Sequence, residues 1–334
     1  MFKIDINNKV TIKDVAARAG VSTATVSNVI NNSTPVKEKT KELVLKTIKE
    51  LNYHPDRVAR GFKTGKTHTI GLIVPDISNN FFASLMENIE SILKEKNYQV
   101  LVANTHESAE NELDSIKLFT SGMVDGLIIA SSMTEYKPLE GVLPKNGRIP
   151  VVFLERSVNN CPFDSVMISD YASTAQSVEY LIENGHKNIG FLYGINTISP
   201  CIERLNAYKT TLLKHNIQVN DGYIKNVPSY AFGEIKNLID GGCTAIVAST
   251  NKVTIDAIMY YLNNGISFDK IQLVGYLNDD FASESMTNML SVLHPIKELA
   301  SHAVKLLFNR MANPSSNIKN TVLLSRFVKP QNTK

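Results

Sequence analysis

Residues 11–31 read Thr-Ile-Lys-Asp-Val-Ala-Ala-Arg-Ala-Gly-Val-Ser-Thr-Ala-Thr-Val-Ser-Asn-Val-Ile-Asn. This stretch predicts two short helices joined by a tight turn. Thr11 and Asp14 have the spacing of a capping box at the start of the first helix. Gly20 suits the left-handed position that ends this helix, and Ser22 suits the N-cap of the next one. The stretch therefore predicts a helix-turn-helix arrangement.

The second predicted helix turns small residues outward. Val26, Val29 and Ile30 recur at helical spacing and are expected to face inward. The outward residues are Thr23, Ala24, Thr25, Ser27 and Asn28. Small side chains let a helix enter the DNA major groove, which is about 12 Å wide. A helical hairpin that only packs on its neighbours is the alternative, but the turn spacing, the caps and the small outward face together favour DNA binding.

Positive charge is concentrated at the N-terminal end of the chain. The whole sequence has a formal net charge of +3. Residues 1–67 contain 13 basic and 6 acidic residues, a net +7, whereas the rest contains 22 and 26, a net −4. A basic head on a slightly acidic body is expected of a nucleic-acid-binding module joined to a second function. A solvated lysine-rich surface is the alternative explanation of the charge alone.

Length and composition indicate an intracellular protein with more than one domain. A chain of 334 residues, of which 43% are apolar, is expected to form two or three domains with sizeable cores. The longest apolar runs, such as residues 70–74, have the length of a strand, and residues 1–10 lack a secretory signal. Cys161, Cys201 and Cys243 have no metal-ligand spacing. We expect free thiols, no metal, no cofactor, no membrane contact and a cytoplasmic, nucleoid-associated location.

A third helix is predicted over residues 35–51. Val44, Ile48 and Leu51 share one face of it and would close a small three-helix core.

Residues 55–67 form a short basic segment after this core. Pro55 suits the first turn of a helix of about nine residues, which is too short to be stable alone in water. Its basic residues are Arg57, Arg60 and Lys63, and its aromatic residue is Phe62. Such a helix can fold on DNA, with Phe62 between base steps of the minor groove and the basic residues on phosphates. A plain linker is the alternative, and these residues alone do not decide between the two.

From residue 69 onward, strand-like and helix-like segments alternate. The predicted strands are residues 70–74, 98–104, 126–130, 150–154, 189–193, 245–249 and 273–276, and the predicted helices are residues 82–96, 110–122, 175–184, 202–215 and 252–263. Such alternation, in two runs, predicts two similar lobes of parallel sheet covered by helices, with a cleft between them. Ligands of such sheets bind beyond the carboxyl ends of the strands. The loops expected there are residues 76–82, 155–156, 194–204 and 276–280.

Several segments resemble the LacI (lactose-repressor-type) family of bacterial transcription regulators. The resemblance is carried by Val-Thr-Ile-Lys-Asp-Val-Ala-Ala-Arg-Ala-Gly-Val-Ser at residues 10–22 and by Leu-Asn-Tyr at 51–53 followed by Pro55. It continues with Ile-Gly-Leu-Ile-Val-Pro-Asp at 70–76, Gly-His-Lys-Asn-Ile at 185–189 and Val-Gly-Tyr at 274–276. The family resemblance implies a head that binds half of a nearly palindromic operator and a body similar to periplasmic sugar-binding proteins.

The expected fold is an N-terminal all-α helix-turn-helix domain followed by an α/β periplasmic-binding-protein-like body of two doubly wound parallel-sheet lobes. We expect the head at residues 1–54 and the hinge helix and linker at 55–67. The N-terminal lobe is expected at residues 68–158 and 292–322, and the C-terminal lobe at 159–291 and 323–334.

The resemblance implies that Thr23, Ala24 and Asn28 face base edges. Asn can bond to adenine N6 and N7, and the Ala methyl can pack on a thymine methyl. Phe62 stands where the family usually has an inserting leucine, and an apolar side chain is all that a minor-groove wedge requires. The expected DNA-binding residues are Thr11, Ser22, Thr23, Ala24, Thr25, Ser27, Asn28, Arg57, Arg60, Phe62 and Lys63.

The resemblance also implies an effector site in the cleft, at Phe81, Phe82, Glu155, Arg204, Thr250 and Leu277. Thr250 stands where asparagine is usual, and Leu277 replaces an aspartate that commonly accepts bonds from sugar hydroxyls. Without that acceptor a sugar would lose about 1–3 kcal/mol. We therefore expect an effector that is sugar-like but less polar near Leu277, or anionic and held mainly by Arg204. A surface salt bridge is the alternative role for Arg204.

Three functions remain to be compared. The first is a repressor that binds its operator as a homodimer under the control of a small-molecule effector. The second is a doubly wound enzyme, but the sequence has no nucleotide-binding glycine motif, no phosphate loop, no nucleophile elbow and no His-Glu-x-x-His motif. The third is a DNA-binding regulator controlled by a protein partner instead of a cleft ligand.

Overall fold

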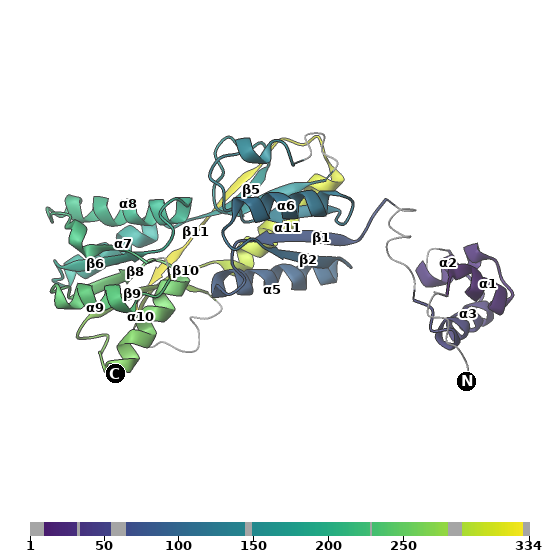
Figure 1. Cartoon of the computed structure of the whole chain (residues 1–334), viewed down its shortest axis with the longest axis horizontal. Coiled ribbons are helices and arrows are strands. Elements are labelled where there is room, and N and C mark those ends of the chain that lie inside the picture. Colours follow the sequence, from purple (N-terminus) through teal and green to yellow (C-terminus); the bar gives the residue numbers. More distant parts are fainter. Residues whose placement is uncertain are drawn as a thin grey trace. The chain divides into compact units, whose positions relative to one another are not determined.

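The computed structural model of the chain describes residues 10–31, 34–54, 65–143, 149–227, 229–279 and 289–329. The chain forms two compact units, Met1–Thr67 and His68–Lys334, which Figure 1 shows coloured along the sequence. Each unit has its own hydrophobic core.

Three helices make up the described part of the first unit: α1 (Ile12–Ala19), α2 (Thr23–Asn31) and α3 (Glu38–Glu50). The predicted capping box is present, because the Asp14 carboxylate accepts the Thr11 backbone N–H at 2.8 Å. Gly20 ends α1 with φ of 65°. Val15, Val26 and Val44, one from each helix, are fully buried together. The third helix starts at Glu38 instead of residue 35, because Lys37 has the non-helical backbone of an N-cap.

The second unit contains two six-stranded sheets. The first has the strand order β11-β5-β4-β3-β1-β2 and the second β12-β10-β9-β8-β6-β7. The strands of the first sheet are β1 (Thr69–Val74), β2 (Gln99–Asn104), β3 (Gly126–Ile129), β4 (Val151–Glu155), β5 (Asp164–Ser169) and β11 (Asn320–Leu324). Those of the second are β6 (Ile189–Tyr193), β7 (Ile224–Asn226), β8 (Ala245–Ala248), β9 (Gln272–Asn278), β10 (Leu290–His294) and β12 (Arg326–Val328). Neighbouring strands are parallel except β10 and β12.

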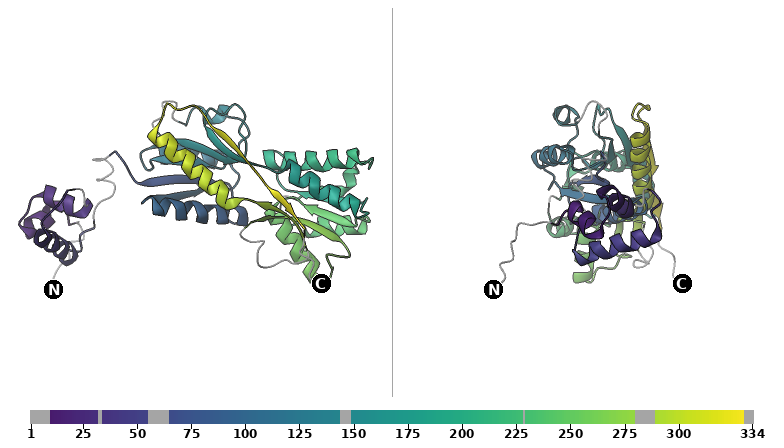
Figure 2. Two further views of the ribbon diagram at one scale, coloured as in Figure 1. Left: turned by 180° about the vertical axis from the view of Figure 1, so that it is seen from behind. Right: turned by 90° about the vertical axis from the view of Figure 1, so that its right-hand side faces the viewer.

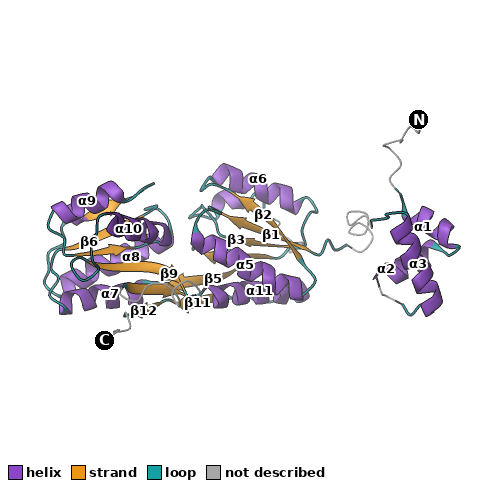
Figure 3. Cartoon of the chain, turned by 90° about the horizontal axis from the view of Figure 1, so that it is seen from below, coloured by secondary structure: helices purple, strands orange, loops and turns teal. Residues whose placement is uncertain are grey.

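Helices cover both faces of each sheet, as Figure 3 shows. The helices of the first lobe are α5 (Asn80–Glu95), α6 (Ala109–Thr120) and α11 (Ile296–Ala312), and those of the second are α7 (Tyr171–Glu183), α8 (Ser199–Lys214), α9 (Phe232–Asp240) and α10 (Asn251–Asn263). The predicted pair of doubly wound lobes is confirmed. Several helices begin two to four residues earlier than predicted, because their first turns carry polar residues such as Asn80.

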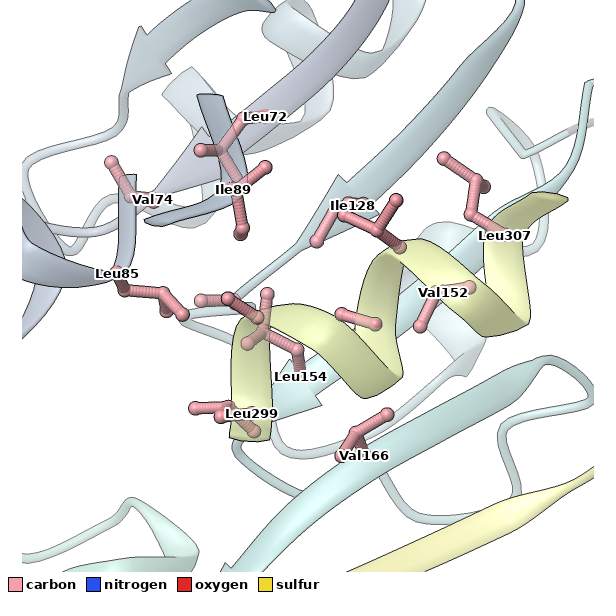
Figure 4. Close-up of a cluster of buried hydrophobic side chains, with 14 of the residues drawn as sticks. Leu72, Val74, Leu85, Ile89, Ile128, Val152, Leu154, Val166, Leu299 and Leu307 are labelled. Carbon is pink, nitrogen blue, oxygen red and sulfur yellow. The ribbon is translucent and has the colours of Figure 1, made fainter. Parts of the chain in front are cut away.

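The core of the first lobe lies between its sheet and the helices α5 and α11. Leu85 and Ile89 from α5 and Leu299 from α11 pack on the buried strands, and Figure 4 shows these side chains converging with those of Leu72 and Val152. All of them are fully buried. Burial of each such side chain contributes about 1.5–3 kcal/mol, so α11, from the C-terminal third of the chain, is an integral part of this lobe.

The first predicted boundary between the lobes is wrong by about eleven residues, and the other two by two or three residues. Strand β5 (Asp164–Ser169) pairs with β4 in the first sheet, although residues 159–291 were assigned to the C-terminal lobe. Strand β10 pairs with β9 in the second sheet, although residue 292 was expected to return to the first lobe. In the described residues the chain therefore passes between the sheets near residues 170, 295 and 325. Figure 2 shows the last of these passages from behind.

The reason for this error lies in a contact that the sequence does not show. Strand β5 begins with Asp164, which is almost fully buried. Arg310 of α11 donates to both carboxylate oxygens of Asp164, at 2.9 and 2.8 Å. The two residues are 146 positions apart in the sequence. Because Arg310 pairs with Asp164, strand β5 can begin with a buried charge. Strand β5 therefore lacks the apolar pattern by which buried strands are recognised.

Two further expectations concern composition. Cys161, Cys201 and Cys243 are free thiols, as predicted. Among the described residues, no helix has both the length and the apolar composition needed to cross a membrane.

Candidate functional site

The exposed start of α2 is the candidate DNA-reading surface. Ser22 caps the helix by accepting the Thr25 backbone N–H on its hydroxyl at 3.0 Å. Thr23 and Ala24 are exposed, while Thr25, Ser27 and Asn28 are half-buried. The predicted outward face is therefore most open at its first two residues. Small side chains at a helix start suit close approach to a DNA backbone or groove.

Two of the expected DNA contacts are also structural. The Thr11 hydroxyl donates to Asp14 at 2.7 Å, and the Ser22 hydroxyl lies 2.9 Å from that of Thr25. Both residues are exposed. Arg57, Arg60, Phe62 and Lys63 lie outside the described residues.

In the body, Arg204 of α8 lies in a buried polar cluster. Its Nε donates to Asp170 Oδ2 at 2.7 Å, and its Nη1 donates to the Ser249 backbone carbonyl at 2.7 Å. Its guanidinium also lies 4.8 Å from the centre of the Tyr276 ring. Arg204 is 6% exposed and Asp170 is fully buried. Arg204 is thus held in an internal ion pair and does not form a surface salt bridge.

His294, at the end of β10, extends this cluster to the other lobe. Its Nε2 lies 3.2 Å from Asp170 Oδ1. Its ring meets the ring of Phe81, on α5 of the first lobe, edge to face at 5.5 Å. The cluster therefore joins the two lobes at the carboxyl ends of their strands, where ligands of parallel sheets bind.

The electrostatics of the cluster favour an ionised Asp170. Burial by itself would raise the pKa of Asp170, but Arg204 and His294 outweigh burial and hold the pKa well below its usual range. Burial also opposes the charge of Arg204, and Asp170 more than compensates, so the pKa of Arg204 is raised. The two charges therefore persist together inside the protein.

A second ion-pair cluster lies beside β4. Arg156 donates from Nη1 and Nη2 to Glu107 at 2.6 and 2.8 Å and from Nε to Glu155 at 3.1 Å. Its guanidinium lies 5.6 Å from the centre of the Phe82 ring. Burial raises the pKa of Glu155, against the opposing influence of Arg156 and Arg204. Glu155 also has φ of 68°, a left-handed conformation that costs a non-glycine residue about 1–3 kcal/mol and is typical of functional sites.

The remaining expected effector residues serve the fold in other ways. The Thr250 hydroxyl caps α10 by accepting the Val253 N–H at 3.2 Å. Leu277 is 1% exposed and packs in the core beneath α9 and α10. Its neighbour Asn278 accepts from Asn251 at 2.9 Å and donates to the Asn80 carbonyl of the first lobe at 3.2 Å. The structure thus explains the apolar residue at 277 by packing, and it places an amide next to it that bridges the lobes.

Sequence reasoning missed Asp170 and His294. Asp170 directly follows strand β5, and His294 is the last residue of strand β10. The apolar pattern of the sequence revealed neither strand. Ser249 Oγ and His294 Nδ1 are buried and have no hydrogen-bond partner among the described residues, and Asp170 Oδ1 has only its ion-pair contact with His294. Buried polar atoms are rarely left unpaired, so they are candidates for contact with a ligand or water.

Comparison with known proteins agrees with this architecture. The family model for bacterial regulatory proteins of the lacI family matches residues 11–56, and that for periplasmic binding proteins and the sugar binding domain of the LacI family matches residues 67–287. The chain belongs to the LacI family.

Curated relatives match it along most of its length. A probable HTH-type transcriptional regulator, EndR of Paenibacillus polymyxa, is 34% identical, covering 90% of each chain. Catabolite control protein A of Priestia megaterium is 32% identical, covering 90% of this chain and 92% of the relative. These relatives are transcriptional regulators, so the enzyme alternative is set aside. The protein is a DNA-binding transcriptional regulator of the LacI family with a periplasmic-binding-type body.

Solved structures share the fold. A lac repressor dimer bound to operator and the anti-inducer ONPF has a TM-score of 0.81 at 24% identity, covering 96% of this chain and 98% of that one. A complex of the transcriptional regulator CelR with cellobiose has a TM-score of 0.67 at 26% identity, with the same coverage.

We predict that Asp170→Asn destabilises the body in a pH-dependent way. At pH 7 the variant leaves the Arg204 charge buried without its partner, which should lower the free energy of unfolding by about 3–5 kcal/mol. The folded pKa of Asp170 is depressed, so its contribution is present above the unfolded pKa of about 3.9 and is lost as the pH falls below it. The deficit of the variant should therefore shrink at pH 3.5.

Urea unfolding of the full chain at the two pH values measures this difference. The pKa of Glu155 is raised. Glu155 is present in both proteins, so its effect on the pH dependence largely cancels when their free energies of unfolding are compared. Asp269→Asn, at an exposed position, is the control and should change little. An equal deficit at pH 7 and pH 3.5 would show that the negative charge of Asp170 is not the source of its contribution.

Proposed function

We propose that this LacI-family protein represses transcription by binding a two-fold symmetric operator as a homodimer, on the nucleoid, and that a small-molecule effector in the interlobe cleft controls this binding. The observation that carries the proposal is the start of α2, where the Ser22 cap leaves Thr23 and Ala24 exposed at the tip of a three-helix core. One such head, which together with the segment to residue 67 has a net charge of +7, would bind DNA weakly and with little discrimination, so two heads on a two-fold site are required.

The base contacts follow from the residue types. Asn28 would pair with an adenine edge, and Ala24 would pack on a thymine methyl. Thr11, Ser22, Thr23, Thr25 and Ser27 would contact phosphates or base edges from the two helix starts. Phe62 would enter the central minor groove, with Arg57, Arg60 and Lys63 on the flanking phosphates.

An exposed apolar patch on α9 and α10 supports homodimer formation through the body. Met259 and Leu262 are 47% and 66% exposed, and Tyr230 is 79% exposed. Phe232 lies edge to face on Tyr260 at 5.6 Å and is also exposed. Exposed apolar side chains gathered on neighbouring elements mark interaction surfaces, and a second copy of the chain is the partner that a two-fold operator demands.

Several observations support an effector in the cleft. The body matches a sugar-binding family model, and the related CelR structure holds cellobiose. Phe81, Glu155 and Arg204 lie at the carboxyl ends of facing sheets, and Ser249 Oγ and His294 Nδ1 are buried there without partners. An effector would shift the balance between lobe arrangements that allow or prevent pairing of the two hinges. Because Asp170 already neutralises Arg204, a sugar-like effector is favoured over an anionic one.

Control by a protein partner is the second candidate, and one surface favours it. Strand β11 is an edge strand, and its residues Val322 and Leu324 are 60% and 65% exposed, next to Ile318 at 50%. An apolar sheet edge is a surface to which another protein can add. A tight protein ligand, with no small molecule bound to the body, would favour this alternative.

Selection of bound sequences from a random DNA duplex library tests the main proposal. We expect the full-length protein to enrich a two-fold symmetric motif, because the homodimer presents two heads. The central step should be a flexible pyrimidine–purine step that Phe62 can open. Enrichment of an asymmetric motif, or only salt-sensitive binding without sequence preference, would contradict the proposal.

We predict that Asn28→Ala weakens binding to the selected operator by about 1–3 kcal/mol and relaxes the preference at one base pair in each half-site. The loss arises because alanine cannot make the paired bonds to adenine. Fluorescence anisotropy with the operator and its single-base variants measures both effects. A uniform loss on all sequences would instead make Asn28 a phosphate contact.

We predict that Leu262→Glu converts the protein to a monomer and weakens operator binding at least tenfold, because a buried charge in the α9–α10 patch would oppose association. Leu213→Glu is the matched control, since Leu213 is similarly exposed, at 61%, but lies on α8. Sedimentation velocity gives the oligomeric state. If the Leu262→Glu protein is still dimeric, the dimer interface lies on another surface.

A further inference from the structure

A cavity lies at the junction of the lobes, and Arg204 does not line it. Its volume is about 510 Å³, within the range of ordinary small-molecule sites. It is lined by Thr134, Ser157, Asn159, Tyr171, Thr197, Ser199, Ile202, Glu203 and Asn206. None of the six expected effector residues lines it. We call this cavity the side pocket.

The side pocket and Arg204 lie on different faces of helix α8. Ser199, Ile202 and Asn206 follow the spacing of one helical face and line the pocket. Arg204 and Tyr208 lie on another face of the same helix, which is buried. A ligand in the side pocket would therefore contact a different surface of α8 from a ligand beside Arg204.

The side pocket is rich in uncommitted hydroxyl and amide groups. The side chains of five lining residues form no hydrogen bond with any described residue: Thr134, Ser157, Tyr171, Thr197 and Asn206. Hydroxyl and amide groups both donate and accept, which suits a ligand that carries many hydroxyls. Tyr171 and Ile202 are 40% and 45% exposed and add an apolar surface, on which the face of a sugar ring can pack.

The charges of the side pocket disfavour an anion. Among the described residues that line it there is no lysine or arginine, and the carboxylate there is that of Glu203. Glu203 is fixed there, because it accepts from the Ser169 hydroxyl at 2.5 Å and from the Asp170 backbone N–H at 3.2 Å. A phosphorylated sugar would meet this negative charge without a compensating cation.

We propose that the side pocket is a second ligand site, which takes a neutral sugar of one or two rings. Three lining residues come from the first lobe: Thr134, Ser157 and Asn159. The other lining residues come later in the sequence, after the chain first passes from one sheet to the other near residue 170. The Ser157 N–H already donates to Ser199 Oγ across this junction at 2.9 Å. A bound sugar adds further bonds between the lobes and so biases their arrangement. This inference rests on the effector control proposed above and gives it a second location.

The absence of tryptophan from the sequence allows a direct test in the full-length protein. Tyr171→Trp places the only tryptophan of the variant in the side pocket, and Tyr98→Trp, beside Phe308 at the amino end of β2, is the control. Both are titrated with glucose, ribose, maltose, cellobiose and sucrose, and with glucose 6-phosphate. At least one neutral sugar should change the Tyr171→Trp emission saturably, with no change in Tyr98→Trp and at least tenfold weaker binding of glucose 6-phosphate.

Two further substitutions in the Tyr171→Trp protein locate the sugar. Asn206→Ala, at an exposed position, should weaken its binding at least tenfold. Ser249→Ala, in the Arg204 cluster, should leave the affinity within twofold. If Ser249→Ala weakens binding and Asn206→Ala does not, the sugar binds beside Arg204. This result would overturn the inference but would still agree with the proposed effector control.

Binding of glucose 6-phosphate alone, or of no sugar in the panel, would also overturn the inference. Operator selection is measured without any sugar, so failure of the side pocket and failure of the proposed DNA-binding function are separate results.

Discussion

The ion pair between Arg204 and Asp170 is the constraint on which the rest of the body depends. Moving two charges out of water costs several kcal/mol for each ion, and only a close partner with further hydrogen bonds offsets this cost. Arg204 therefore has to meet Asp170 and the Ser249 carbonyl at the same time. These three residues come from α8, the end of β5 and the end of β8, so the pair fixes the ends of three separate segments at one point between the lobes.

Under the proposed effector control, a signal between the cleft and the DNA would pass through this point. Phe81 reaches the cluster from α5, in the lobe that directly follows the hinge segment, and His294 reaches it from the strand that leads into α11. Asn278 adds a bridge to the Asn80 carbonyl. A rigid, paired cluster of this kind transmits a change of lobe arrangement because it has few alternative geometries. The side pocket lies on the opposite face of α8, so a ligand there would act on the same helix.

The head is stabilised in a different way from the body. Its core consists of a few valines and alanines, and its α1 and α2 are each shorter than an isolated helix needs to be stable. The capping box at Thr11, the left-handed Gly20 and the Ser22 cap satisfy the free ends of these helices locally. Local bonds therefore stabilise the ends of these helices, and the first residues of α2, Thr23 and Ala24, stay exposed.

The sequence by itself determined the head, the alternating architecture of the body and the family. Each of these depends on neighbours a few residues apart: caps, turns, and apolar residues at helical or strand spacing. Only the tertiary structure decided the lobe boundaries, through the Arg310–Asp164 pair, and the composition of the cleft, through Asp170 and His294. It also gave Leu277 a place in the core where sequence reasoning had expected a ligand contact. The physical reason is common to these cases: a buried charge or an apolar residue at a strand end is explained by a partner far away in the chain, and only the folded protein brings the two together.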